Sequence, residues 1–229
     1  MTVTPPQVPA GVSRLSAGRD HPLRLLDLFC GAGGAARGYQ QAGFHVVGVD
    51  IKPQPRYAGD QFMQGDAMEY VSAHGHEYDA IHASPPCQTF ARVTAWRGSR
   101  ANHTDLLAPT LAALARTPAP WVVENVPEAP LRADLILCGT QFGLTVRRHR
   151  VFQLGGWSLF ELRPPCHHPR RLLPFEHKAE RAYADAMGCQ WMSNREARQA
   201  IPPAYTQWIG QRLAAHLAAT HPTDRRSTP

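Results

Sequence analysis

The stretch LRLLDLFCGAGGAARGYQQAGFHVVGVD, residues 23–50, decides the fold. It begins with the apolar run Leu23–Phe29, which predicts a buried strand. A glycine-rich turn follows, and the sequence then favours a helix over Gly34–Gln41. A second apolar run, His45–Asp50, predicts the next strand. Apolar strands separated by a helix indicate a parallel sheet that is buried on both faces.

The same alternation continues toward the C-terminus. Further strands are predicted at Gln61–Asp66, Asp79–Ser84 and Trp121–Val126, and helices at Thr104–Arg116 and Ala204–Ala219. We therefore expect an α/β fold, a mostly parallel sheet with helices on both faces. Ligands of such sheets bind beyond the carboxyl ends of the strands, where the chemically interesting residues of this chain fall.

Length and composition indicate one globular domain. The chain has 229 residues, of which 43% are hydrophobic and 18% charged. It contains no apolar run long enough to span a membrane, and the first twenty residues lack the apolar core of a secretory signal, so we expect a cytoplasmic protein. The five cysteines form no CxxC pair, which predicts reduced thiols rather than a disulfide framework.

The net charge is +6, and the basic residues are 22 Arg and 2 Lys. Arginine presents a bidentate fork to phosphate, so the excess is compatible with nucleic-acid binding. High arginine with little lysine is also what GC-rich coding produces, whatever the function.

The ends of the first three predicted strands carry a candidate nucleotide site. Gly31, Gly33 and Gly34 would let the backbone approach a ligand at a helix N-terminus. Asp50 could accept hydrogen bonds from ribose hydroxyls, and Asp66 could reach an adenine amino group. The alternatives are glycines that serve packing and aspartates that sit in solvated turns.

The sequence SPPCQTF follows the fourth predicted strand. Its two prolines stiffen the backbone immediately before Cys87, which makes this thiol a candidate nucleophile. Such a thiol needs positive surroundings that lower its pKa. A lone cysteine is otherwise most often a small buried apolar residue.

Charged residues lie at the end of the fifth predicted strand and beyond it. Glu124 ends an apolar run, and a carboxyl there could stay protonated or share a proton with a ring nitrogen. Arg148 and Arg150 are two apart, so on an extended segment both would point to the same side and could clamp a base carbonyl, a phosphate or the cysteine loop. The alternatives are a structural carboxyl and an exposed basic strand.

Together, DLFCGAGG, VGVD, GDA, SPPCQTF, ENV and RRHR resemble, in this order, the DNA (cytosine-5) methyltransferase family. The resemblance covers residues 23–152 and resumes at Ala200–Gly210. It implies a Rossmann-like fold, S-adenosyl-L-methionine as cofactor and DNA as substrate. The alternatives are the same chemistry on RNA or a free cytosine nucleotide, and a catalytically silent DNA-binding regulator.

The resemblance also assigns roles to residues. Cys87 would be the nucleophile, Glu124 would hold the target base at N3, and Arg148 and Arg150 would support the base and the cysteine loop. The residues that would bind the cofactor are Phe29, Gly31, Gly33, Gly34, Asp50, Ile51, Asp66, Ala67 and Pro85.

The chain departs from the family in its recognition region. Bacterial members usually carry a long segment after the paired arginines, whereas Val151–Gln199 has 49 residues here, and IPPAYT replaces the usual Gly-Asn-Ser pattern. We expect a short or loosely defined target, or a protein partner or homodimer that supplies recognition. The predicted divisions are tails at 1–21 and 220–229, a catalytic domain at 22–152, a reduced recognition segment at 153–190 and a C-terminal segment at 191–219.

Histidines and cysteines gather in and near the recognition segment, and zinc favours their side chains. They are Cys138, Cys166, His167, His168, His177 and Cys189. Their spacing matches no familiar zinc pattern. The sequence therefore favours ordinary surface side chains here and predicts no metal site.

Overall fold

A computed structural model describes residues 21–86, 90, 105–161, 163–169 and 180–220. The predicted nucleophile Cys87 and the candidate ligand His177 lie outside the described residues, as do nearly all of the two predicted tails. None of the helices in the described part of the chain is long and apolar enough to cross a membrane.

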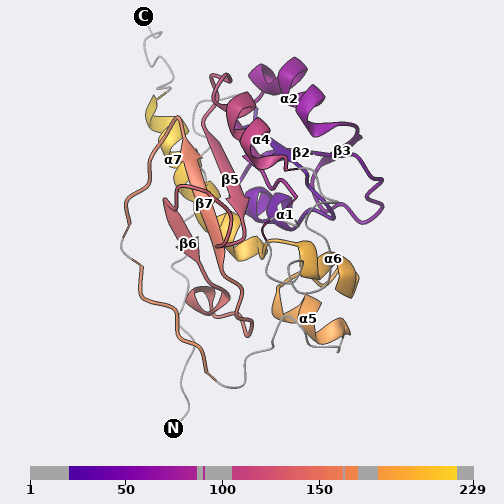
Figure 1. Ribbon diagram of the computed structural model, residues 1–229, viewed down its shortest axis with the longest axis vertical. Coiled ribbons are helices and arrows are strands. Elements are labelled where there is room, and N and C mark those ends of the chain that lie inside the picture. The colour runs from indigo at the N-terminus through magenta and orange to yellow at the C-terminus, as the bar shows by residue number, and fades with distance from the viewer. Residues whose placement is uncertain (1–20, 87–89, 91–104, 162, 170–179, 221–229) are drawn as a thin grey trace, which may run out of the picture.

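The described residues form a seven-stranded sheet in the order β3-β2-β1-β4-β5-β7-β6 (Figure 1). The strands are β1 (Arg24–Leu28), β2 (His45–Asp50), β3 (Gln61–Gln64), β4 (Ala80–Ala83), β5 (Trp121–Asn125), β6 (Leu135–Leu137) and β7 (Arg150–Gly155). β1 to β5 are parallel, which confirms the predicted fold class. β7 is antiparallel to β5, and β6 is antiparallel to β7.

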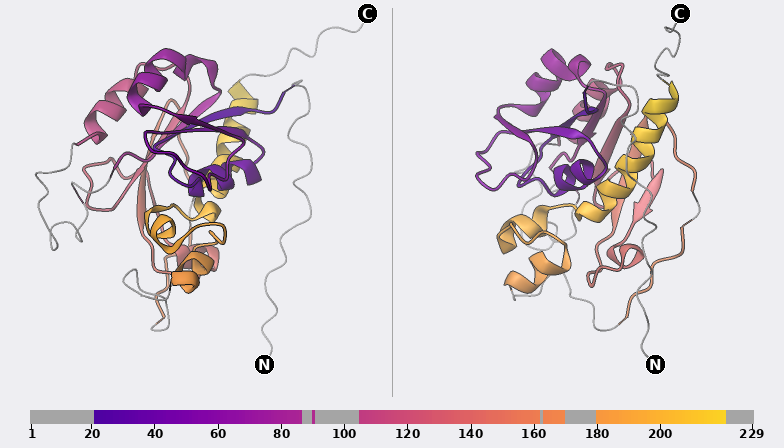
Figure 2. Two further views of the ribbon diagram at one scale, coloured as in Figure 1. Left: turned by 90° about the vertical axis from the view of Figure 1, so that its right-hand side faces the viewer. Right: turned by 180° about the vertical axis from the view of Figure 1, so that it is seen from behind.

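Helices cover both faces of the sheet (Figure 2). They are α1 (Gly34–Gln41), α2 (Ala67–His74), α4 (Leu107–Leu114), α5 (Glu180–Ala186), α6 (Asn194–Gln199) and α7 (Pro203–Thr220), with short 3₁₀ turns η1 (Gly75–Glu77) and η3 (Gly139–Phe142). Strand residues alternate between the faces. Leu25 packs with α1 and α7, whereas Leu26 and Leu28 pack with α2 and α4.

The packing of α1 on α7 depends on two glycines. A Cβ atom on Gly34 would lie 2.4 Å from the Ile201 carbonyl oxygen, and one on Gly38 would lie 2.1 Å from that of Pro203. The Thr206 hydroxyl donates to the Ala35 carbonyl at 2.8 Å across the same contact. Gly34 therefore serves helix packing, the alternative that the sequence left open for the glycine turn.

The C-terminal half differs from the sequence prediction in its boundaries. The predicted division at residue 152 falls inside β7, which continues to Gly155 because its backbone pairs with β5 as far as Trp121. Further along the chain, α5 and α6 form a third buried cluster that includes Tyr183, Met187 and Cys189. This cluster contacts the glycine turn, where the Trp191 indole donates to the Ala32 carbonyl at 2.9 Å.

Candidate active site

The turn after β1 is tied to the end of β2. Phe29, Gly31 and Gly33 all have positive φ, at 59°, 50° and 81°, and Phe29 is a strained position because it carries a side chain. The Gly31 amide donates to Asp50 at 3.0 Å, and the second oxygen of that carboxylate accepts the Lys52 amide at 2.9 Å. Asp50 thus fixes the shape of two neighbouring turns at the carboxyl edge of the sheet.

Open space lies beside these turns. A Cβ atom on Gly31 would meet no atom within 4 Å, and the apolar side chain of Ile51 is 66% exposed. Asp66 follows β3 and caps α2, because one of its carboxylate oxygens accepts the amides of Met68 and Glu69 at 2.7 and 3.1 Å. The cap explains why β3 ends at Gln64 rather than at Asp66 as predicted.

The loop that leads to Cys87 is held from β5. The Asn125 side chain is 1% exposed; its amide nitrogen donates to the Pro85 carbonyl at 3.1 Å, and its amide oxygen accepts the Val126 amide at 2.9 Å. Pro85 is buried, and its backbone carbonyl accepts this hydrogen bond. Asn125 therefore fixes the stiff dipeptide immediately before the predicted nucleophile. The sequence analysis missed this residue, although its place directly after Glu124 is a usable signal.

Glu124 is a buried carboxyl paired with an arginine. It is 6% exposed, and its Oε1 lies 2.6 Å from Nε of Arg150. Burial raises the pKa of Glu124. Part of this rise is offset by the guanidinium groups of Arg150 and Arg148 and by Ser84. The side chain is therefore able to hold a proton at a higher pH than an exposed glutamate.

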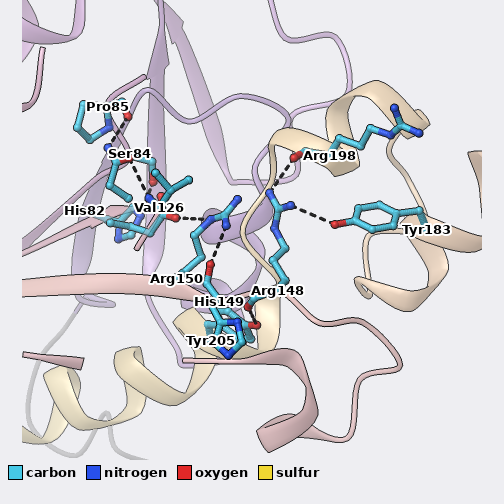
Figure 3. A network of polar contacts seen from close by, with 12 residues as sticks. His82, Ser84, Pro85, Val126, Arg148, His149, Arg150, Tyr183, Arg198 and Tyr205 are labelled. Atoms are coloured by element: carbon cyan, nitrogen blue, oxygen red, sulfur yellow. Dashed lines mark hydrogen bonds and ion pairs between the residues drawn. The ribbon is translucent and has the colours of Figure 1, made fainter. Parts of the chain in front are cut away.

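The two arginines lie side by side and project in the same direction from the chain (Figure 3), as their spacing suggested, but they have different partners. Arg150 reaches Glu124, whereas Arg148 donates to the Tyr183 hydroxyl at 3.1 Å and to the Arg198 carbonyl at 2.8 Å. Arg148 is 3% exposed, and burial together with the charge of Arg150 lowers its pKa. Arg148 therefore connects the sheet to the α5–α6 region, while Arg150 contacts the carboxyl.

A buried histidine, also missed from the sequence, supports the same carboxyl. The His82 ring lies between the Tyr39 hydroxyl at 3.0 Å and the Ser84 hydroxyl at 2.9 Å. Burial lowers the pKa of His82 to about 3, so the ring is neutral. His82 thus holds the Ser84 hydroxyl, and Ser84 acts on the carboxyl by lowering the pKa of Glu124. The signal was a histidine within the otherwise apolar stretch Ala80–Ala83.

The arrangement brings together a buried carboxyl with a raised pKa, a paired guanidinium and a fixed loop, all at the carboxyl edge of the sheet. A carboxyl whose pKa is raised is better able to donate a proton to a ring nitrogen than an exposed carboxyl is. A guanidinium beside it can bind a carbonyl oxygen or a phosphate. The glycine turn and Asp50 lie at the ends of the neighbouring strands, where a nucleoside fits.

Comparison with known proteins gives consistent matches. Residues 23–131 match the family model described as C-5 cytosine-specific DNA methylase. The chain is 26% identical over 180 residues to the Type II methyltransferase M.AgeI of Thalassovita gelatinovora, covering 62% of this chain and 42% of that protein. It is 31% identical over 118 residues to the Type II methylase M.HgiDII of Herpetosiphon aurantiacus, covering 45% of this chain and 33% of that protein.

The fold is shared with the S. pombe Dnmt2 methyltransferase. The TM-score is 0.53 at 15% identity, and the likeness covers 87% of this chain and 99% of that one. This likeness concerns the fold alone. The chain spans less than half the length of the two curated relatives named above.

Proposed function

Because the chain belongs to the C-5 cytosine-specific DNA methylase family through residues 23–131, we propose that it transfers a methyl group to carbon 5 of cytosine in DNA. The nucleophile of this reaction is Cys87. The observation that carries the proposal is the buried Glu124–Arg150 pair, at 2.6 Å, beside the loop that Asn125 fixes. A carboxyl that holds its proton beside a guanidinium suits N3 and the neighbouring carbonyl of a cytosine ring.

The ends of β1, β2 and β3 fit the nucleoside part of S-adenosyl-L-methionine. The space beside Gly31 is open, the apolar face of Ile51 is exposed, and Asp50 has carboxylate lone pairs near both turns. When bound, this group supplies an electrophilic methyl on a sulfonium sulfur. Asp50 and the Gly31 turn would hold its ribose, and Phe29 and Ile51 would contact its base.

The residues of this chain then carry the acid–base and covalent steps. The Cys87 thiolate adds to carbon 6 of cytosine while Glu124 gives its proton to N3, which makes carbon 5 nucleophilic. Carbon 5 would then take the methyl group, and cleavage of the bond from sulfur to methyl would leave a neutral thioether. Loss of the carbon 5 proton to a base then expels the thiolate, and the N3 proton returns to Glu124. A cytosine in a duplex must leave the base stack before this chemistry.

Recognition of DNA rests on the short interval Val151–Gln199. It offers basic side chains that suit phosphates, and phosphate contacts orient a protein without specifying a sequence. We infer weak, strongly salt-dependent binding and a short target context, with a protein partner or a second copy as a further source of recognition. Arg170 and Arg171 lie outside the described residues. Replacing both by alanine should reduce the slope of log binding constant against log salt concentration by up to about 2 units.

Tritiated methyl transfer to duplex DNA, single-stranded DNA, RNA and dCMP, measured in parallel, tests the reaction and the substrate class. DNA that contains 5-fluorocytosine should trap the wild type covalently, since fluorine does not leave carbon 5 as a proton does. Cys87→Ser should lose both transfer and trapping. Cys189→Ala removes a buried thiol from the α5–α6 region and should keep both. Trapping that survives in Cys87→Ser would refute the nucleophile, and transfer to RNA or dCMP alone would refute DNA as substrate.

A further inference from the structure

Two cysteines and two histidines meet at the far edge of the sheet, outside the site described above. The ligand atoms of Cys138, His149, Cys166 and His168 all lie within 4.8 Å of one another. Cys138 is buried, and His149 and Cys166 are half-buried. From this geometry we propose that these four side chains bind one structural zinc ion.

The fold explains how residues so far apart in the sequence come together. Cys138 directly follows β6, and His149 directly precedes β7. Leu137 pairs with Arg150 in the antiparallel ladder, so the next position along places Cys138 opposite His149. The register between β6 and β7 thus places the first two ligands next to each other.

The other two ligands come from the chain after β7, which Figure 1 shows as an extended orange trace on the β6 side of the sheet. Cys166 and His168 are two residues apart, and alternate residues of an extended chain face the same way. His167 lies between them and is exposed. The C-x-H pair therefore presents both ligands to the β6–β7 edge.

The distances suit a tetrahedral zinc ion. Sγ of Cys138 lies 3.3 Å from Nε2 of His168, and Sγ of Cys166 lies 3.4 Å from Nε2 of His149. Zinc bonds of about 2.3 Å to sulfur and about 2.0 Å to nitrogen place neighbouring tetrahedral ligands about 3.6 Å apart. The His149 and His168 rings are perpendicular, with centroids 5.0 Å apart, so they do not stack against each other.

The chemistry of the set agrees with a closed structural site. Two thiolates balance the double charge of zinc, and four protein ligands leave no position for a substrate. The Thr140 hydroxyl donates to Sγ of Cys138 at 3.5 Å and gives this sulfur an outer partner. The sequence analysis named three of these residues among its candidates but missed His149, and it included Cys189, which is buried in the separate α5–α6 cluster.

The segment that the ion would fix is already docked beside η3 and α7. The Arg163 guanidinium lies 4.3 Å from the ring centroids of both Phe142 and Trp208. Gln141 donates to the Pro164 carbonyl at 2.9 Å. Residues 156–169 form no helix or strand among those that the structure describes. A metal cross-link gives such a segment the rigidity that a core would otherwise supply.

The site also reaches the proposed active site through the backbone. His149 lies between Arg148 and Arg150, and its carbonyl accepts a hydrogen bond from Arg150 at 2.8 Å. The Arg148 carbonyl accepts one from the Tyr205 hydroxyl at 2.5 Å. A zinc ion on the His149 ring would fix the backbone that carries both arginines.

Metal analysis of the full-length protein tests the proposal independently of methyl transfer. Protein purified under reducing conditions without chelator should contain one zinc per chain by plasma mass spectrometry. The double variant Cys166→Ser with His168→Ala should lose at least about tenfold of this metal, and the matched control His167→Ala should keep it. Cobalt(II) added to chelator-treated wild type should give the visible bands of a tetrahedral site and a thiolate charge-transfer band.

Three results would overturn the proposal. One is reduced wild-type protein that lacks zinc and gives only octahedral cobalt spectra. Another is a double variant that retains stoichiometric zinc. The third is a Cys138–Cys166 disulfide in freshly isolated protein, found by mass spectrometry without reduction. The wild-type measurements decide the matter even where the double variant fails to fold.

Discussion

Replacing Asn125 by alanine tests whether the loop before Cys87 is positioned from β5. The change removes a buried donor to the Pro85 carbonyl and a buried acceptor for the Val126 amide. An unsatisfied buried polar group costs about 1–3 kcal/mol, so two of them should lower the free energy of unfolding by about 2–6 kcal/mol where no water enters. The lost side-chain volume adds to this cost.

The functional effect should exceed the loss of stability. With Pro85 released, the Cys87 thiol no longer has a fixed approach to carbon 6, and a misplacement of about 1 Å can cost about 100-fold in rate. We expect kcat to fall by about 10- to 100-fold at a temperature where the variant is fully folded, with KM nearly unchanged. Asn125→Asp keeps the acceptor for Val126 but turns the donor into a carboxylate oxygen, so it should also be slow.

Urea unfolding followed by circular dichroism measures the stability, and the rate of trapping by 5-fluorocytosine DNA measures the approach of the thiol. Gln153→Ala is the matched control, because Gln153 also joins a side-chain amide to a backbone group, accepting from the Arg132 amide at 3.0 Å in an exposed position. It should cost about 0.5–1.5 kcal/mol at most and leave trapping unchanged. An Asn125→Ala variant that is as stable and as fast as the Gln153→Ala control would refute the positioning role.

Three further changes probe other parts of the fold. Glu124→Gln should lower the rate of methyl transfer by about 10²–10⁴-fold. Because burial raises the pKa of Glu124, the wild-type rate should fall as pH rises through that pKa, whereas the rate of the variant should not show this fall. A variant whose rate is within a few-fold of wild type would make Glu124 structural. The same raised pKa means that the Glu124 contribution to stability is present at acid pH and lost as pH rises, a dependence that unfolding of Glu124→Gln should not show. Asp50→Ala should weaken S-adenosyl-L-methionine binding by about 1–3 kcal/mol in calorimetric titration, and unchanged affinity would contradict the placement of the ribose. In an isolated helix, Gly38→Ala would raise the stability of the helix by about 1 kcal/mol. Here its Cβ would lie 2.1 Å from the Pro203 carbonyl oxygen, so urea unfolding should instead show a net loss of about 1–3 kcal/mol, and a more stable variant would refute the helix contact.

The sequence by itself determined the first five strands, α1, and the edge of the sheet where we propose the active site. These follow from local patterns. Apolar runs of strand length at Leu23–Phe29 and His45–Asp50, separated by a glycine turn and a helix, admit one arrangement, and parallel strands collect their following residues at one edge. Glu124 could be placed there because it ends an apolar run.

Only the tertiary structure shows which contacts the second half of the chain makes. The spacing of Arg148 and Arg150 predicted their shared direction, but not their partners, which are Tyr183 on α5 and Glu124 on β5. The cluster of Cys138, His149, Cys166 and His168 has no recognisable spacing, because strand register and the return of the chain after β7 bring its members together. Local periodicity carries no information about such contacts, which arise from the pairing of segments that are distant in the chain.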